Sequence, residues 1–432
     1  MSVSTSALES LRILLVDWTI ENVKATSLAD IEVAAVAVQR TCGQVVAETA
    51  LLRAGGEETY LGSSVPCSCG GKARFVGYRP RRVKTVVGVA RVERAYYYCC
   101  VCGTGQLPWD REQGLDEQLW SPKVKALVSE VCAHLAYGVG VRLLERISGV
   151  RLEESSAEEI VLAVGARLRQ DEDQKTSHYG SVPERATTPA ERRGRLYVGL
   201  DAAKAHIDGG WHDVKVATLY EAKPDSVGRD HPSETQYCAA QEGSDAFGRR
   251  LYAQARERGL ERFSECVVIG DGAEFIWNQA SQHFPGATQV VDFWHASEHV
   301  WSLSRTLYGE GCAQGKRWAQ ARVRSLKEDG PEPLIRAIKR RKPANMRERE
   351  ELRLQRGYFT KNRARMNYPA YRARGMMIGS GPVEAGCKTV VCHRLKQSGM
   401  RWSGPGSDAV LAVRTAVLSQ QFARIDQFAR AA

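Results

Sequence analysis

A single glutamate stands in a strongly basic segment near the end of the chain. Between residues 359 and 407, Glu384 is the only acidic residue among nine lysines and arginines. It follows the turn-forming sequence Gly-Ser-Gly-Pro at 379–382, and Pro382 suits the first turn of a helix. A carboxylate that serves only solubility would usually have acidic neighbours. Glu384 is therefore a candidate ligand for a hard cation such as Mg²⁺.

Three aspartates follow apolar runs that have the character of buried strands. Asp201 ends the run at residues 196–200, Asp271 follows CVVIG, and Asp292 follows TQVV. Ligands bind at the carboxyl ends of strands in open α/β sheets. Each aspartate alone could be a turn former or a helix cap, but their recurrence favours a shared site. Two strand-borne aspartates and Glu384 on a helix could converge on Mg²⁺, and a pair of ions would serve phosphodiester displacement.

Five of the twelve cysteines lie in two clusters beside glycines. Residues 67–71 read Cys-Ser-Cys-Gly-Gly, and residues 99–103 read Cys-Cys-Val-Cys-Gly. Alternating β-type residues broken by Gly88 predict a hairpin between them. Two thiol-bearing knuckles on a hairpin are typical of a zinc ribbon, although C-x-C departs from the usual C-x-x-C of the first knuckle. The expected ligands of Zn²⁺ are Cys67, Cys69, Cys99 and Cys102. Cys100 competes as a ligand, and a hairpin that packs without metal is the alternative.

Charge is unevenly distributed along the 432 residues. Residues 301–432 hold 27 Lys and Arg against 10 Asp and Glu, whereas the first 300 residues hold 34 against 40. A basic C-terminal third favours nucleic acid as a partner over a merely solvated basic surface. No secretory signal or membrane-spanning run is visible, and cysteines without a signal are typical of reduced thiols in the cytosol. We therefore expect a cytoplasmic protein with no membrane contact.

Helical patterns surround the cysteines. After them, apolar spacing predicts helices at 121–135, 139–147 and 156–170. Short helices joined by a tight glycine-containing turn fit a helix-turn-helix unit, with a plain three-helix bundle as the alternative. Residues 171–194 have the composition of a linker, and the strand-rich segment with the aspartates follows it.

Four segments together resemble the bacterial insertion-sequence DDE transposases of the Kra type, and the resemblance covers most of the chain. They are the cysteine-rich ribbon with GTGQLPWD, then VGLDAAKAHI, VIGDGAEFIWNQASQHFPGATQVVDFWHASEHVW and GSGPVEAGCKTVVCHRLKQSGMRWS. The resemblance implies a ribonuclease-H-like core with Asp201, Asp271 and Glu384 as the metal-binding triad. Asp292 and His295 match an Asp-x-x-His element that lies close to the triad but is not counted among its ligands.

The expected fold is multidomain α+β: a ribonuclease-H-like α/β core with a helical insertion, preceded by a zinc ribbon and a helix-turn-helix-like region. The expected boundaries are 1–60 for an N-terminal helical region, 61–110 for the ribbon, 111–180 for the helix-turn-helix-like domain, 195–300 for the first part of the core, 301–375 for the insertion, and 376–432 for the catalytic helix and the end of the core.

The resemblance implies a transposase that binds double-stranded DNA at the terminal inverted repeats of its element and at the target, as a homo-oligomer. A two-metal site with Mg²⁺ or Mn²⁺ would free a 3′-hydroxyl that attacks target DNA without a covalent protein intermediate. In a bacterium the protein would join the nucleoid when bound to DNA. The expected phosphate contacts are Lys388, Arg394, Lys396 and Arg401. The alternatives are a ribonuclease-H-like nuclease or resolvase without strand transfer, and a domesticated DNA-binding protein without catalysis.

Overall fold

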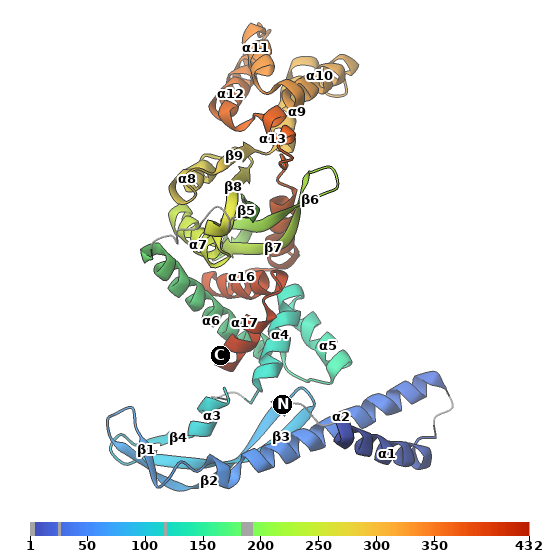
Figure 1. The fold of residues 1–432 in the computed structure, drawn as a ribbon, viewed down its shortest axis with the longest axis vertical. Helices are drawn as coiled ribbons and strands as arrows, with labels where there is room; N and C mark the ends of the chain where they lie inside the picture. Colours follow the sequence, from blue (N-terminus) through green and yellow to red (C-terminus); the bar gives the residue numbers. More distant parts are fainter. Residues whose placement is uncertain (1–4, 25–26, 116–118, 183–192, 432) are drawn as a thin grey trace. The chain divides into compact units, whose positions relative to one another are not determined.

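The computed structural model describes residues 5–24, 27–115, 119–182 and 193–431 (Figure 1). The protein is mixed α+β with two sheets. Its two units are Met1–Leu127 with Val141–Glu153, and Val128–Gly140 with Glu154–Ala432. Among the described residues, no helix has both the length and the apolar character needed to cross a membrane.

The first unit contains a four-stranded antiparallel sheet with the strand order β1-β2-β3-β4. Its strands are β1 (Ser64–Pro66), β2 (Lys72–Thr85), β3 (Gly88–Cys99) and β4 (Thr104–Gln106). The long strands β2 and β3 form a hairpin that closes between Thr85 and Gly88, which confirms the predicted hairpin.

Helices accompany this sheet: α1 (Thr5–Asn22), α2 (Leu28–Ala54), the short η1 (Gly56–Thr59) and α3 (Pro108–Glu112). Helix α2 is largely exposed and contains no fully buried residue. The short α3 is tied to the hairpin by buried Asp110, which accepts hydrogen bonds from Arg81 at 2.7 Å and from Arg94 at 2.8 Å.

Three helices follow: α4 (Pro122–His134), α5 (Tyr137–Ser148) and α6 (Glu154–Ser181). The first two agree closely with the predicted helices. The prediction of a linker from residue 171 is wrong up to Ser181, because α6 continues through that segment. The cause is packing: Glu172 is buried and accepts a hydrogen bond from Arg169 at 2.5 Å. Residues 183–192 of the predicted linker lie outside the described residues.

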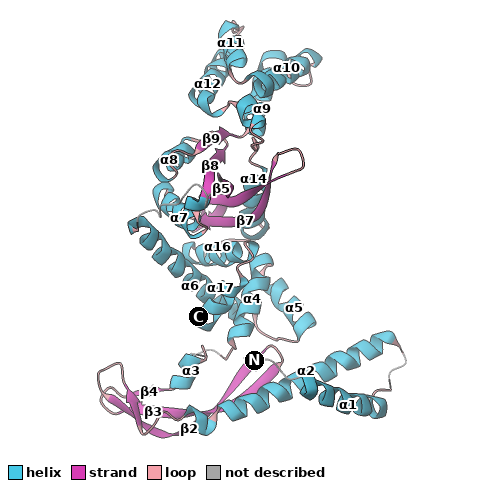
Figure 2. Ribbon diagram, viewed as in Figure 1, coloured by secondary structure: helices cyan, strands magenta, loops and turns pink. Residues whose placement is uncertain are grey.

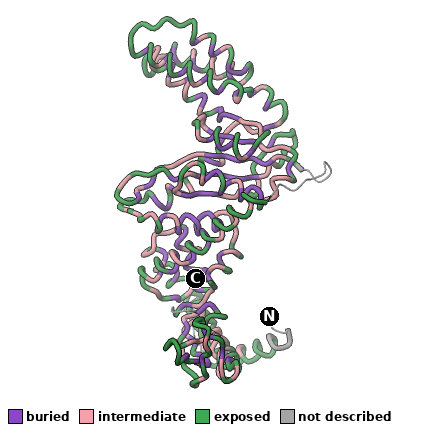
Figure 3. Tube along the Cα trace, turned by 90° about the vertical axis from the view of Figure 1, so that its left-hand side faces the viewer, coloured by how far each residue is buried: buried purple, intermediate pink, exposed green. Residues whose placement is uncertain are grey.

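The second unit is built on a five-stranded sheet with the order β7-β6-β5-β8-β9 (Figure 2). Its strands are β5 (Arg193–Ile207), β6 (Gly210–Pro224), β7 (Asp230–Ala240), β8 (Phe263–Gly270) and β9 (Thr288–Val291). The first three strands run antiparallel, and β8 and β9 run parallel to β5. The strand centres are buried, as the purple segments of Figure 3 show, and they form the main hydrophobic core.

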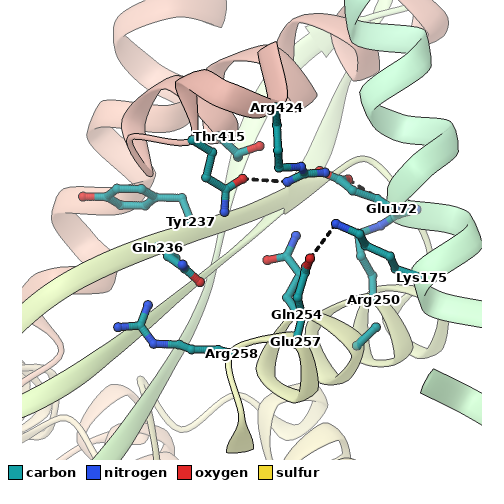
Figure 4. Close-up of a pocket in the computed structure, with 12 residues that line it drawn as sticks. Glu172, Lys175, Gln236, Tyr237, Arg250, Gln254, Glu257, Arg258, Thr415 and Arg424 are labelled. Atoms are coloured by element: carbon teal, nitrogen blue, oxygen red, sulfur yellow. Dashed lines mark hydrogen bonds and ion pairs between the residues drawn. The ribbon is translucent and has the colours of Figure 1, made fainter. Parts of the chain in front are cut away.

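Helices pack around this sheet: α7 (Ser244–Glu257), the short η3 (Leu260–Arg262), α8 (Glu274–His283) and α16 (Gly404–Leu418). Helix α17 (Phe422–Ala431) packs against α6 and α16. A small polar pocket of about 180 Å³ lies among α6, α7, β7, α16 and α17 (Figure 4). Ion pairs join its walls: Lys175 contacts Glu257 at 2.5 Å, and Arg424 contacts Asp171 at 2.7 Å. These contacts connect α6 to α7 and to α17, so the pocket has the character of a packing feature.

The segment after β9 is helical, as predicted. It contains α9 (Phe293–Tyr308), α10 (Ala313–Asp329), α11 (Glu332–Arg340), α12 (Met346–Asn362), η4 (Arg363–Arg365) and α13 (Tyr368–Ala373). The chain then returns to the sheet in one continuous helical run: α14 (Gly381–Gly386), the π-helical segment η5 (Cys387–Cys392) and α15 (His393–Leu395). Glu384 therefore lies on a helix, in agreement with the prediction from Pro382.

Candidate functional site

Asp201 and Asp271 occupy equivalent positions on neighbouring parallel strands. The pairing of β5 with β8 runs to Gly199 and Ile269, so each aspartate comes two residues beyond the last pair. Neighbouring strands lie about 4.8 Å apart, which brings the two carboxylates to one edge of the sheet. The prediction that Asp201 ends its strand is wrong: β5 continues to Ile207 because it forms a long antiparallel hairpin with β6. What ends near Asp201 is only the pairing with β8.

The Asp201 carboxylate is half-buried and has polar neighbours at both oxygens. Oδ1 accepts the N–H of Ala202 at 2.7 Å, and Oδ2 accepts the thiol of Cys387 at 3.3 Å. Burial raises the pKa of Asp201 and the charge of Asp271 raises it further, although both hydrogen bonds and the charge of His295 oppose this. The two aspartates and His295 therefore share one electrostatic environment, and a cation bound there would offset the repulsion.

The helix with Glu384 lies beside this edge because α14 packs closely on β5. A Cβ at Gly199 would lie only 2.9 Å from Cβ of Val383, so glycine is required for this approach. Cys387 is one turn after Glu384 and senses the charge of two candidate acids. Burial is the main cause that raises the pKa of its thiol, and the charges of Asp201 and Glu384 raise it further. The Glu384 side chain is exposed, and the π-helical segment begins three residues later. Such segments are frequent at functional sites.

Asp292 joins the segments that carry the other acids. Its N–H donates to the carbonyl of Gly270, directly before Asp271, at 2.7 Å. Its fully buried carboxylate caps α9 by accepting the backbone N–H of Trp294 and, at 2.9 Å, that of His295. The other oxygen accepts both the N–H and the hydroxyl of Ser380.

Ser380 immediately precedes α14, and its carbonyl accepts the N–H of Glu384 at 3.1 Å. With all its contacts inside the protein, Asp292 has the geometry of a positioning residue. The structure places it beside the predicted triad, as the Asp-x-x-His element implied, with its carboxylate engaged in holding the backbone.

His295 and two residues that sequence reasoning missed line the same region. His295 is half-buried, with its ring 5.1 Å from that of His299. Tyr358 stacks on His299 with ring centroids 3.8 Å apart, and its hydroxyl donates to the carbonyl of Asp271 at 3.0 Å. Burial lowers the pKa of His299 and raises that of Tyr358. Because Tyr358 lies 87 residues beyond Asp271, no local pattern predicts this contact.

The four cations predicted to bind phosphate differ in exposure. Lys388, Lys396 and Arg401 are exposed, so each of them stays a predicted phosphate contact. Arg394 is fully buried, so the prediction that it contacts DNA is wrong.

Packing explains the burial of Arg394. Its guanidinium donates to the carbonyl of Cys132 at 2.9 Å and lies over the rings of Tyr137 and Trp402 at 5.0 and 4.9 Å. Burial lowers the pKa of this guanidinium. Arg394 therefore serves the packing of the C-terminal segment.

The four predicted zinc ligands form one cluster in the first unit. Sγ of Cys67 lies 3.6 Å from Sγ of Cys102, and Sγ of Cys69 lies 3.7 Å from Sγ of Cys99. Thiolates at about 2.3 Å from a tetrahedral Zn²⁺ are about 3.8 Å apart, so this cluster can hold such an ion. Cys100 is exposed and not part of the cluster.

Tight turns shape both knuckles. The N–H of Gly70 donates to the carbonyl of Cys67 at 3.0 Å, and the N–H of Gly103 donates to that of Cys99 at 2.9 Å. Both glycines have a positive φ, which favours glycine there.

The cluster's pKa values reflect its crowding. The Thr104 hydroxyl and then Cys67 lower the pKa of Cys102 to about 6. A hydrogen bond from the N–H of Gly71 lowers the pKa of Cys69, but the three neighbouring cysteines have a larger combined effect and raise that pKa to about 12.

The cysteines and the acids differ in how closely their ligand atoms gather. In the part of the chain that the structure describes, the four cysteines are the one group of three or more His, Cys, Asp or Glu ligands whose atoms all lie within 4.8 Å of one another. The carboxylates of Asp201, Asp271 and Glu384 are more widely spaced than that. Their type and their place at one edge of the sheet suit a hard cation, but exposed Glu384 must turn inward to share one.

Comparison of the chain with models of protein families finds no match. Comparison with curated proteins likewise finds no significant relative.

Proposed function

We propose that the protein is a DDE transposase, a DNA-binding enzyme that cleaves and joins DNA strands with three carboxylates, Asp201, Asp271 and Glu384. The observation that carries this proposal is that the segments with the three acids lie beside one another. Asp201 and Asp271 occupy matching positions just beyond the pairing of the parallel strands β5 and β8. Glu384 is on α14, which packs against β5 at Gly199. Independent support comes from Asp292, which connects the backbone beside Asp271 to the start of the helix with Glu384.

The architecture of the second unit also favours this function. Three antiparallel strands followed by two parallel ones, with the order β7-β6-β5-β8-β9, is the arrangement expected of a ribonuclease-H-like core. A helical segment separates Asp271 from Glu384, as the resemblance to the Kra-type transposases implies. Acids that are distant in sequence but adjacent in the fold are typical of a metal-dependent phosphodiester site.

The chain's own residues would divide the work as follows. Asp201, Asp271 and Glu384 would hold Mg²⁺, which when bound would activate the attacking oxygen and stabilise the leaving oxygen. The Ala202 N–H and the Cys387 thiol fix the orientation of the Asp201 carboxylate. Exposed Lys388 lies one turn after Glu384 and would bind the reacting phosphate, and exposed Lys396 and Arg401 would bind phosphates further along the strand.

The cysteine cluster is assigned to a structural Zn²⁺ ion in a ribbon. Four thiolates close a tetrahedral site and leave no position for a substrate. The apolar cluster beside it is small and consists of Val65, Ala73, Ala95 and Tyr97 with the buried Cys67 and Cys99. Bound metal would therefore stabilise this part of the chain.

The proposal is tested with a supercoiled plasmid that carries the DNA flanking the gene. Asp201→Asn, Asp271→Asn and Glu384→Gln should each abolish nicking in Mg²⁺ while retaining DNA affinity, because affinity rests mainly on phosphate contacts. The control is Asp213→Asn, which changes an exposed acid paired with Lys204 on the same sheet. Wild-type nicking by all three variants would contradict the assignment of the triad. Cleaved ends that never join a target would favour the nuclease.

A further inference from the structure

A strongly basic groove lies on the helical insertion, away from the residues assigned so far. It is formed by the end of α11, the loop after it and one side of α12. Figure 1 labels both helices. The groove measures about 710 Å³ and has no acidic lining residue. Its cationic lining residues are Lys339, Arg341, Arg349, Arg353, Arg356 and Lys361.

The arginines on α12 are spaced to follow an extended anion. Arg349, Arg353 and Arg356 stand at i, i+4 and i+7, which places them on one face of the helix. The seven residue-to-residue steps from Arg349 to Arg356 span about 10 Å at 1.5 Å per step. Successive phosphates of one DNA strand advance about 3.4 Å along the duplex axis, so this row matches about three of them. A single small anion would engage only part of the row.

The charge of the groove is only partly balanced within the protein. Arg353 pairs with Glu350 at 2.6 Å and Lys361 pairs with Glu274 at 2.9 Å, but all four side chains are largely exposed, so the pairs are weak. For the other cations that line the groove, no ion pair occurs within the described residues; they are Lys339, Arg341, Arg349 and Arg356. Like charges gathered on one surface repel one another, and a bound polyanion would relieve that repulsion.

The groove is connected to the candidate catalytic edge through α12. Lys361 lines the groove and contacts Glu274 in the first turn of α8, three residues after Asp271. On the same helix, Tyr358 donates its hydroxyl to the carbonyl of Asp271. Two contacts thus hold one end of the basic row beside one of the proposed metal ligands. A DNA strand in the groove would therefore pass close to that ligand.

We propose that this groove binds the phosphate backbone of duplex DNA next to the cleavage position, without reading its sequence. The position relative to cleavage rests on the proposed function, whereas binding in the groove does not. The contacts are charge-based, because arginine and lysine on exposed helix faces suit phosphate oxygens. On sequence alone, the arginine-rich stretch at residues 335–350 has the composition of a solvated helical face with incidental phosphate contact. Only the folding of α11 against α12 brings its cations onto one surface.

The test compares two triple variants of equal charge. One is Lys339→Gln with Arg349→Gln and Arg356→Gln, in the groove. The control is Lys316→Gln with Arg317→Gln and Arg324→Gln, three exposed cations of α10 in the same insertion but outside the groove. Affinity for a random-sequence duplex is measured over a range of salt concentrations. Each lost phosphate contact lowers the slope of log K against log salt by about 0.9.

The groove variant should lose roughly 2 to 3 units of slope, and the control should lose less than 1. Equal slopes for the two triple variants would overturn the proposal. That result is also the one expected if the groove binds an acidic protein segment in place of DNA. If the triple groove variant does not fold, the single variant Arg356→Gln tests the proposal in its place. Its slope of log K against log salt should fall by about 1 unit, and an unchanged slope would overturn the proposal.

Plasmid nicking by the unaltered protein is measured in parallel. If the unaltered protein nicks the plasmid and the groove variant keeps the salt slope of the unaltered protein, the groove proposal is wrong and the proposed function stands. If the groove variant loses slope but the unaltered protein does not nick the plasmid, the proposed function is wrong and the groove proposal stands.

Discussion

Replacing Asp292 should destabilise the second unit, because its carboxylate holds two segments together. Asp292→Ala removes the cap of α9, which typically costs about 0.5–2 kcal/mol. It also leaves the buried N–H and hydroxyl of Ser380 without their acceptor, at about 1–3 kcal/mol. The free energy of unfolding should therefore fall by roughly 2–5 kcal/mol, and the melting temperature by roughly 5–15 °C. Asp292→Asn keeps one capping oxygen, so its melting temperature should lie between those of Asp292→Ala and the wild type.

The assay is differential scanning calorimetry of the full chain with its zinc retained, first without added Mg²⁺ and then with it. Ser380→Ala is the matched control, since it removes only the hydroxyl partner and should cost less than Asp292→Ala. A wild-type melting temperature for Asp292→Ala without Mg²⁺, together with loss of the response to Mg²⁺, would refute this reasoning. Asp292 would then be a metal ligand.

Three further predictions follow from the remaining sites. The protein should bind about one Zn²⁺ per chain, and Cys99→Ser should lower the metal content while Cys100→Ser should not; folded protein free of metal would contradict this assignment. Asp201→Asn should raise the melting temperature at pH 7, because a raised pKa in the folded state means that ionisation of Asp201 opposes folding. The gain should disappear on acidification below about pH 3, where both states are protonated; a gain that is independent of pH would contradict the cause given. Arg394→Gln should lower the melting temperature without altering the salt dependence of DNA affinity. Lys396→Gln should lower the slope of log affinity against log salt by about 1 unit, with little effect on the melting temperature. The opposite pattern would show that Arg394 contacts DNA.

Local chemistry was sufficient to predict several parts of the fold and the candidate sites. Cysteine spacing around a hairpin predicted a cluster whose four sulfurs do gather. The apolar run before Asp271 predicted β8, and Pro382 predicted the helix with Glu384. In each case, the deciding interactions lie between residues that are close in sequence, or follow from strand and turn patterns.

Long-range packing decided the parts that the sequence did not reveal. Asp201 looked like the end of a strand, but pairing with Val216 in β6 carries the strand past it. Arg394 looked like a phosphate contact, yet its acceptor on Cys132 lies 262 residues away. The role of Asp292 depends on Ser380, 88 residues later, and hydrophobic patterning contains no information about such a pair.

The central claim is that Asp201, Asp271 and Glu384 hold metal as one group, and Mn²⁺ binding tests it most directly. Titration followed by electron paramagnetic resonance needs no knowledge of the DNA sequence. Protein with its zinc retained should bind Mn²⁺, and Asp201→Asn, Asp271→Asn and Glu384→Gln should each abolish or strongly weaken that binding, whereas Asp213→Asn should not. Retention of wild-type Mn²⁺ affinity by all three variants would contradict the account.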